Sequence, residues 1–414
     1  MTAITPAGAP QGLDPAVNVG LGRWGYLIGG IVLLLAMGLV YAWSIFVAPL
    51  EREFGWTRSE TSLAFSICMS MFCAGVIATG LLTKKITART VIWLSALLVG
   101  GGFVGASRLS TLGQLYFFYG GLIGLGVGMA YNGVLSTIMR WFPERPGLIS
   151  GLLMMGFGLG ALILGTVGTY LIDGIGWRLT FRNLGFVYLA VIIVSSFFIK
   201  LPGPSVVLPR LAGKGGAPPP ADRDWATSEM VRRPTFWLFF AWAVILGACG
   251  LIVISNAAPM ARSLGAASMG GLLTGLIAVF NGLGRVLTGL TYDRIGRHVA
   301  MPALCLGFIA AGALLILGLR AQSVPLLFCG CLLTGTMYGG MPTSASTVIR
   351  LFYGLRHYSL NFSLINLNVV FASFLGPYLS GVLLDRTGSY QTTFLAIIVF
   401  GALSLGLNFM IRRP

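Results

Sequence analysis

The chain has 414 residues, of which 56% are hydrophobic and only 9% are charged, and its net charge is +16. A soluble globular domain carries roughly 25% charged residues, so this composition excludes a soluble protein. The positive charge does not indicate nucleic-acid binding, because the Lys and Arg residues separate apolar segments and do not gather on one face or tail. We therefore expect a membrane protein with the lipid bilayer as its main solvent and no nucleic-acid partner.

Apolar runs of about 20 residues, the length that crosses a bilayer as a helix, recur along the chain. Cutting the sequence at charges and Pro/Gly clusters predicts an all-α membrane protein with twelve transmembrane helices. The first six spans are residues 24–50, 59–83, 90–107, 112–139, 148–172 and 183–201, and the second six are residues 236–261, 269–292, 299–319, 323–349, 357–384 and 390–410.

A Pro- and Gly-rich polar segment divides these spans into two sets of six. The predicted organisation is an N-terminal tail (1–23), a six-helix bundle (24–201), a cytoplasmic linker (202–235), a second six-helix bundle (236–410) and a C-terminal tail (411–414). With the N-terminus in the cytoplasm, that side holds 18 of the 27 Lys and Arg residues and the other side holds eight. Since basic residues are enriched on the cytoplasmic side, we expect both termini there.

Neither the cysteines nor the N-terminal segment indicates a functional site. All six cysteines lie inside apolar stretches, so neither disulfides nor a thiolate metal site is predicted, and we expect no cofactor. The first 20 residues lack the basic and apolar regions of a signal peptide, so we expect the first span to direct membrane insertion. The cysteines are Cys68, Cys73, Cys249, Cys305, Cys329 and Cys331.

The two halves resemble each other at nearly constant spacing. Gly80-Leu-Leu-Thr-Lys-Lys85 and Gly289-Leu-Thr-Tyr-Asp-Arg294 follow the second spans of their halves, 209 residues apart. The segments that begin at Arg140 and Arg350 match at 210 residues. Parallel six-helix repeats with a binding site at their interface are typical of one class of secondary transporter.

The second of these loops resembles a known family signature. Residues Gly289, Asp293, Arg294, Gly296 and Arg297 are similar to the cytoplasmic loop motif of the major facilitator superfamily. The resemblance implies that the acidic residue caps helix ends and that the basic residues pair across the halves. The first-half loop departs from this motif, with Lys84 in place of the acidic residue and Thr87 in place of the second glycine.

Within that superfamily, the chain resembles monocarboxylate transporters and oxalate/formate antiporters. The resemblance rests on Trp141-Phe-Pro-Glu-Arg-Pro-Gly-Leu-Ile-Ser-Gly151 in the fifth span, on the segment from Asn256 to Gly265, and on Asn281-Gly-Leu-Gly-Arg285. It implies a bacterial carrier of the L-lactate transporter type, which works as a monomer in the inner (cytoplasmic) membrane and crosses it many times.

Arg285 lies in the middle of the eighth span, where an ionisable group is costly and presumed functional. All eleven acidic residues fall in loops or at span ends, so no acidic partner is predicted at that depth. The guanidinium is therefore expected to bind the carboxylate of the substrate. Alternatively, backbone carbonyls satisfy it or it joins two helices. Asn281, one turn earlier, is expected either to hold the guanidinium or to donate to the substrate.

Polar side chains on other spans are expected to complete the pocket. A tyrosine offers both an apolar wall and a hydroxyl, and hydrogen bonding between helices is the alternative role for these residues. One fixed cation suits one carboxylate, and the neutral pair Ile365-Asn366 replaces a Lys of the resembled oxalate carriers, so a small monocarboxylate is favoured. The further candidate contacts are Tyr131, Tyr338, Asn256, Tyr41 and Tyr119.

Proton symport by alternating access is the expected mechanism. One proton cancels the charge of one carboxylate, which otherwise costs about 2.3 kcal/mol per 100 mV to move against the membrane potential. No Walker loop is present, and no cluster of catalytic groups reaches the membrane interior, so ATP-driven transport and an enzyme are both disfavoured. Exchange of two anions, as in oxalate/formate antiporters, and a sensor that has lost transport remain alternatives.

Overall fold

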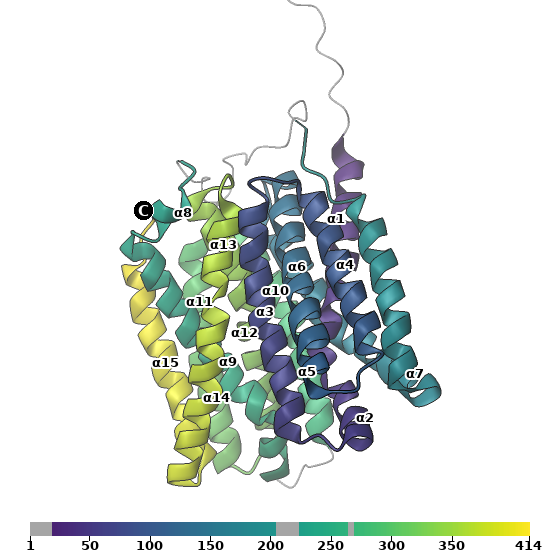
Figure 1. Cartoon of the computed structure of the whole chain (residues 1–414). Coiled ribbons are helices and arrows are strands. Elements are labelled where there is room, and N and C mark those ends of the chain that lie inside the picture. Colours follow the sequence, from purple (N-terminus) through teal and green to yellow (C-terminus); the bar gives the residue numbers. More distant parts are fainter. Residues whose placement is uncertain (1–18, 204–222, 264–268) are drawn as a thin grey trace, which may run out of the picture.

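The computed structural model describes residues 19–203, 223–263 and 269–414 and contains helices but no strand within those ranges (Figure 1). The all-α fold predicted from the apolar runs is confirmed. Most of the predicted N-terminal tail and residues 204–222 of the predicted linker lie outside the described residues, so those two boundaries stay predictions.

The first half consists of the following elements, in which η1 and η3 are 3₁₀ helices and η2 is a π-helix. They are α1 (Val19–Met37), η1 (Gly38–Ala42), α2 (Ser44–Phe54), α3 (Arg58–Leu82), α4 (Ala88–Ala106), α5 (Leu112–Leu115), η2 (Tyr116–Ile123), α6 (Gly124–Ile138), η3 (Met139–Trp141) and α7 (Pro146–Ser196).

The helices of the second half, in the part that the structure describes, are α-helices. Its elements are α8 (Thr227–Met230), α9 (Pro234–Ser263), α10 (Gly270–Arg294), α11 (Arg297–Arg320), α12 (Val324–Tyr353), α13 (Tyr358–Asn366), α14 (Asn368–Thr387) and α15 (Tyr390–Met410). The eleventh predicted span is therefore interrupted, because α13 and α14 meet at Leu367.

Eleven of the described segments are long and apolar enough to cross a membrane, and one of them is α7 with 51 residues. A break inside α7 at Gly176, which has φ 78° and ψ 159°, divides it into two crossing helices. Glycine adopts positive φ without the steric cost of a Cβ. Counting this break gives the twelve predicted crossings, but the sixth begins near Trp177 and not at the predicted residue 183.

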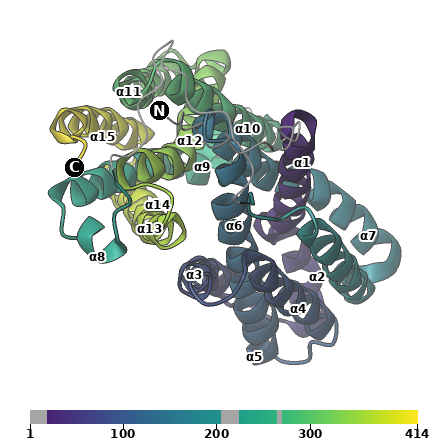
Figure 2. The ribbon, with the colours of Figure 1, turned by 90° about the horizontal axis from the view of Figure 1, so that it is seen from above.

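The helices form two groups when the molecule is seen from above (Figure 2). Helices α1 to α7 lie together, and α9 to α15 lie together beside them. The two groups meet mainly where α10 packs on α7 and where α13 packs on α3. We call the end of the molecule that carries α8 the linker end, and the end that carries α2 the α2 end (Figure 1).

The described end of the linker segment is bonded to the turn between α12 and α13. One carboxylate oxygen of Asp224 accepts hydrogen bonds from the backbone amides of Leu355 at 2.8 Å and Arg356 at 3.0 Å. The amide of Trp225 donates to the carbonyl of Tyr353 at 3.0 Å. This segment therefore belongs to the second half of the molecule.

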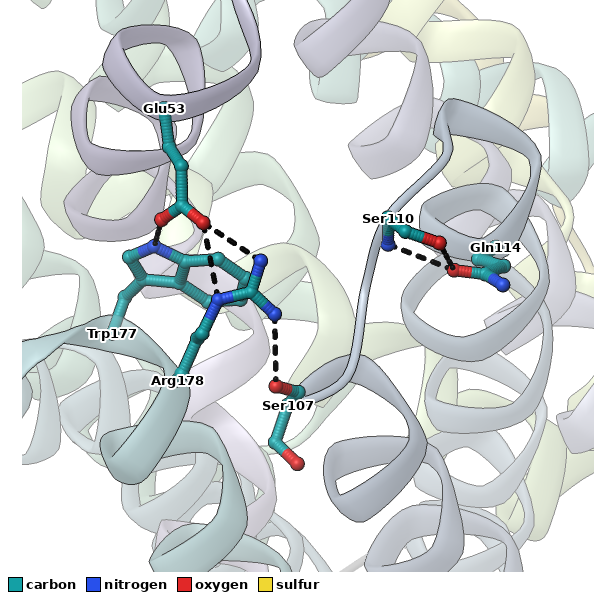
Figure 3. Close-up of polar contacts among 6 residues, drawn as sticks. All are labelled: Glu53, Ser107, Ser110, Gln114, Trp177 and Arg178. Atoms are coloured by element: carbon teal, nitrogen blue, oxygen red, sulfur yellow. Dashed lines mark hydrogen bonds and ion pairs between the residues drawn. The ribbon is translucent and has the colours of Figure 1, made fainter.

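A polar cluster at the α2 end joins three helices of the first half (Figure 3). The carboxylate of Glu53 on α2 accepts from the indole of Trp177 at 2.6 Å and from the guanidinium of Arg178 at 2.7 and 3.1 Å. Arg178 also donates to the carbonyl of Ser107 at the end of α4, at 3.4 Å. The bonds from Arg178 keep the pKa of Glu53 below its usual value.

Glycines let α10 and α12 approach until their backbones touch. A Cβ at Gly284 would lie 1.9 Å from the carbonyl oxygen of Thr336, and one at Gly339 would lie 2.0 Å from that of Asn281. Such distances leave no room for a methyl group. Close packing at small residues is a common way to join helices in a membrane, where burial of apolar surface supplies little driving force.

We predict that Gly284→Ala destabilises the protein by about 1–3 kcal/mol, because α10 and α12 must move apart to admit the methyl group. The measurement is the apparent melting temperature of the purified protein in detergent. Gly275→Ala is the matched control, since it lies on the same helix and a Cβ there has no neighbour within 4 Å. Equal melting temperatures for the two variants would contradict the role of this packing.

Candidate functional site

Arg285 lies on α10 at the interface between the two halves and is 9% exposed. Its Nε donates to the Oδ1 of Asn281, one helical turn earlier, at 3.1 Å. Its Nη1 donates to the backbone carbonyl of Met154 on α7, in the other half. The predicted contact between Asn281 and the guanidinium is therefore present. The carbonyl of Met154 in the first half accepts a second hydrogen bond from the same guanidinium.

No acidic side chain in the described part of the chain neutralises the charge of Arg285. Both of its hydrogen-bond partners are neutral oxygens, and none of the ion pairs within residues 19–203, 223–263 and 269–414 includes it. A buried cation without a counter-ion is costly, and a small anion that reached it would lower that cost.

Three of the predicted tyrosines lie near enough to this cation to interact with its charge. Tyr41 on η1, Tyr131 on α6 and Tyr338 on α12 each interact electrostatically with Arg285. Tyr41 also interacts with the other two. We call Arg285, Asn281, Tyr41, Tyr131 and Tyr338 the Arg285 cluster. Its members come from both halves, as a site at the interface of two repeats requires.

The exposed member of this cluster is Tyr41. It is 44% exposed, whereas Tyr131 is 4% exposed. The ring of Phe157 on α7 contacts both, with centroid distances of 5.3 Å to Tyr41 and 5.0 Å to Tyr131. Phe72 on α3 lies 5.3 Å from Tyr131. The cluster thus has an apolar aromatic wall beside its cation.

Sequence analysis did not select this wall, although Phe157 lies inside the glycine-rich stretch of the fifth span. Gly158 follows it, and a Cβ there would come within 3.3 Å of the central guanidinium carbon of Arg285. Because Gly158 has no side chain, the guanidinium of Arg285 can lie directly against α7. The spacing of glycines in this span was the available signal.

Two candidate contacts, Tyr119 and Asn256, lie apart from the Arg285 cluster. The hydroxyl of Tyr119 donates to the carbonyl of Val40 at 3.2 Å, inside the first half. The amide of Asn256 donates to Ser380 on α14 at 2.7 Å and to the carbonyl of Ile252 at 2.8 Å. Both side chains join helices of one half, which is the alternative that the sequence left open for them.

Asp293, the acidic residue of the motif from Gly289 to Arg297, lies in the last turn of α10 and joins that helix to the first half at the linker end. Asp293 accepts hydrogen bonds from the amides of Gly147 at 2.8 Å and Leu148 at 2.7 Å, in the first turn of α7. A carboxylate at this position also interacts favourably with the helix dipole. Gly289 lies directly against Gly147, since a Cβ on Gly289 would be 2.2 Å from the Gly147 carbonyl oxygen.

The basic residues of the same motif do not pair across the halves in this conformation. The guanidinium of Arg297 lies 5.2 Å from the ring centre of Phe352 in its own half, and Arg294 is exposed. Gly296 has φ 93°, a conformation that favours glycine. The pairing across halves that the resemblance implied for these residues is therefore not observed in the described part of the chain.

Other arginines make those contacts instead. Arg350 on α12 donates to the carbonyls of Met139 at 3.1 Å and Phe142 at 3.5 Å, and Arg140 donates to the carbonyl of Leu355 at 3.2 Å. Sequence analysis had used Arg140 and Arg350 only as evidence of the repeat and of orientation. Arg140 and Arg350 occupy equivalent positions in the two halves. That equivalence was the sequence signal that each contacts the opposite half.

The interface between the halves is closed at the linker end by hydrogen bonds. Several hydrogen bonds between the two halves lie between Arg285 and the linker end. Besides those already given, they join Asn132 to Ser359 and Ser363, Val76 to Ser363, Ser150 to Thr347, and Ser346 to Met139. The arrangement is that of a carrier with one side shut.

Comparison with known proteins agrees with this architecture. A sequence profile for the Major Facilitator Superfamily matches residues 26–377 and 250–414. The chain is 28% identical over 349 residues to the uncharacterized MFS-type transporter YhjX of Escherichia coli K12, covering 83% of this chain and 84% of that protein.

Two further relatives carry names that state a substrate. The chain is 29% identical to the oxalate:formate antiporter of Oxalobacter formigenes, over 67% of this chain and 65% of that protein. It is 26% identical to human monocarboxylate transporter 11, over 99% of this chain and 85% of that protein.

Two solved structures with the same fold are described as outward-facing. The MFS transporter FucP in the outward conformation superimposes with a TM-score of 0.69 at 14% identity, over 94% of this chain and all of that chain. A bacterial homologue of the iron transporter ferroportin in an outward-facing state gives a TM-score of 0.66 at 15% identity, over 94% of this chain and 98% of that chain. Together with the profile match, the twelve crossings in two bundles show that the chain belongs to the major facilitator superfamily of membrane transporters.

Proposed function

We propose that this protein is a secondary active transporter of small monocarboxylates, with L-lactate and pyruvate-like acids as substrates. The observation that carries the proposal is the Arg285 guanidinium, which is buried at the interface of the halves with neutral partners only. A carboxylate forms two parallel hydrogen bonds with such a group. Two of the relatives are named for monocarboxylate and for oxalate and formate transport.

The composition of the cluster favours one negative charge on the substrate. Arg285 is the only cation that interacts with Tyr41, Tyr131 and Tyr338 among the described residues. A dicarboxylate would bring a second charge for which the cluster has no partner. The aromatic wall of Phe72 and Phe157 suits the short apolar part of a small organic acid.

The direction of access follows from the distribution of basic residues. If the linker end is cytoplasmic, as the positive-inside rule indicates, the described conformation is closed toward the cytoplasm. That assignment agrees with the outward states of the two similar structures. We place the protein, as a functional monomer, in the inner membrane of a bacterial cell.

Proton symport is the mechanism that we favour. No described acidic side chain contacts the Arg285 cluster, so the proton is carried on or beside the substrate carboxyl. Hydrogen bonds keep the pKa of Glu53 and Glu60 below the usual value, so these carboxylates stay ionised between about pH 5 and 8. In Glu53 the main partner is Arg178, and in Glu60 it is the backbone of Thr57.

Anion exchange is the second candidate function. The similarity to an oxalate:formate antiporter favours it, and so does the position of Asp293, whose carboxylate is bonded to the start of α7 and not to the cluster. An exchanger needs no proton carrier, because a second anion returns the charge.

We predict that Arg285→Ala lowers uptake of labelled L-lactate into proteoliposomes with an inward proton gradient by about tenfold to a hundredfold, because a charge-assisted bond is lost. Arg285→Lys is expected to give intermediate uptake, since it keeps the charge but not the planar fork. Arg320→Ala, at the exposed end of α11, is the control. Uptake by Arg285→Ala within twofold of the wild type would contradict the proposal.

Symport and exchange give opposite results with empty vesicles. Symport predicts uptake of L-lactate into vesicles without internal anion, rising as the external pH falls from 8 to 5, with weak inhibition by oxalate. Proton movement measured with an internal pH dye should accompany it. Uptake that requires preloaded anion and is strongly inhibited by oxalate would establish exchange and exclude the argument from a single cation.

The closed linker end can be tested with a cysteine placed between the halves. Ser150 is fully buried beside Thr347, so Ser150→Cys should react slowly with a thiol reagent added at the linker side. We predict that Asp293→Asn raises this rate about fivefold, because a carboxylate at a helix start contributes up to about 1 kcal/mol. The background is Cys329→Ser, which removes the exposed cysteine among those described.

Glu229→Gln is the control for this experiment. Glu229 also lies at the linker end, but its carboxylate bonds only within its own segment, to Ala226 and Arg223. Equal labelling rates in the two variants would show that the Asp293 contact does not hold the linker end closed.

A further inference from the structure

The first membrane-crossing helix changes its winding next to the Arg285 cluster. It is α-helical to Met37, becomes the 3₁₀ helix η1 from Gly38 to Ala42, and continues as α2 from Ser44. Tyr41, the exposed member of the cluster, belongs to η1. Mid-helix 3₁₀ stretches often mark hinges or strained segments, because their hydrogen bonds have poorer geometry.

Two buried tyrosines donate hydrogen bonds to backbone carbonyls of this first helix, one just before η1 and one inside it. Tyr188, in the second part of α7, donates to Ala36 at 2.5 Å, and Tyr119, in the π-helix η2, donates to Val40 at 3.2 Å. Ala36 lies in the α-helical part and Val40 in η1, so the two hydroxyls bond to the helix on either side of the change in winding. Val40 directly precedes Tyr41.

Ring and backbone packing hold the same segment from two directions. The ring of Trp43 lies 4.1 Å from that of Tyr119, and its indole donates to the carbonyl of Thr61 at 3.0 Å. On another side, Gly38 lies directly on α7, where a Cβ would be 2.0 Å from the carbonyl oxygen of Phe157. The backbone of η1 is thus fixed by its neighbours.

The side chain of Tyr41 has little support of its own. Its ring packs edge-on against Phe157, and its hydroxyl makes no hydrogen bond to any residue that the structure describes. Its direction therefore depends on the backbone of η1. A 3₁₀ helix turns 120° per residue and an α-helix 100°, so return of Gly38–Tyr41 to α-helix would rotate Tyr41 by about 60°.

We propose that Tyr119 and Tyr188 are positioning residues that hold η1 in its 3₁₀ winding and thereby direct Tyr41 toward the substrate on Arg285. This inference rests on the proposed function, because it takes Tyr41 as a substrate contact. Tyr119 then acts through Tyr41 and does not touch the substrate. The hydroxyls are the acting groups, since the rings serve packing inside the first half.

A double-mutant cycle tests this dependence. Tyr119→Phe keeps the ring and removes the hydroxyl, and it is expected to raise the KM for L-lactate uptake about threefold to tenfold, as loss of one neutral hydrogen bond allows. In a Tyr41→Phe background the same change should have no further effect. Tyr188→Phe should behave in the same way, and it replaces Tyr119→Phe in the cycle if the latter fails to fold.

Tyr116→Phe is the matched control. Tyr116 lies in the same π-helix as Tyr119, but its hydroxyl donates to the carbonyl of Glu60 at 3.1 Å and does not reach η1. Its KM should equal that of the wild type. A second readout is the reaction rate of Tyr41→Cys with a water-soluble thiol reagent, which Tyr119→Phe should change and Tyr116→Phe should not.

The outcomes separate this inference from the proposed function. If Tyr41→Phe impairs uptake and the effects of Tyr119→Phe and Tyr41→Phe multiply independently, the positioning role is wrong while the proposed function stands. If neither Tyr41→Phe nor Arg285→Ala alters uptake of L-lactate, the proposed function itself is wrong. An unchanged rate for Tyr41→Cys in the Tyr119→Phe background would also overturn the positioning role.

Discussion

The charge of Arg285 is the constraint on which the interior of this protein depends. A guanidinium buried in a membrane protein is stable only if its surroundings compensate the lost hydration. Here the compensation comes from one oxygen of each half, the amide of Asn281 and the carbonyl of Met154. These dipoles stabilise the cation without cancelling it, so the site keeps an unsatisfied preference for an anion. Because both halves contribute an oxygen to this one guanidinium, binding of an anion to it would affect the contacts of both halves.

The same pair of helices connects this cation to the closed end. Along α10, Arg285 and Asp293 are eight residues apart, which is about 12 Å of helix. Over that length α10 lies against α7 from Gly151 to Gly147, close enough that a Cβ at either glycine would meet the α10 backbone within 2.5 Å. Such packing does not deform gradually. A substrate carboxylate that took over the guanidinium from Met154 would remove one contact of this seam and thereby favour its opening.

The sequence predicted the fold well because the signals for it are local. Runs of about 20 apolar residues predict membrane-crossing helices. Arg285 stands out because it is charged in the middle of such a run and no carboxylate is predicted at the same depth. The start of the sixth crossing was predicted too late because Arg178 and Arg182 resemble loop residues. Arg178 instead lies within the helix, and its charge is paired with the carboxylate of Glu53. The site was only partly predictable. A tyrosine in an apolar span has the same pattern whether its hydroxyl meets a backbone carbonyl, as in Tyr119, or lies beside a cation, as in Tyr131.

The most direct test of the account is equilibrium binding to the purified protein of L-lactate and of lactamide, which has the same shape but no charge. The account predicts that L-lactate binds and quenches or enhances tryptophan fluorescence saturably, that excess lactamide does not displace it, and that Arg285→Ala abolishes the signal. Equal binding of lactamide, or undiminished binding of L-lactate by Arg285→Ala, would contradict the claim that the buried guanidinium recognises the carboxylate of the substrate.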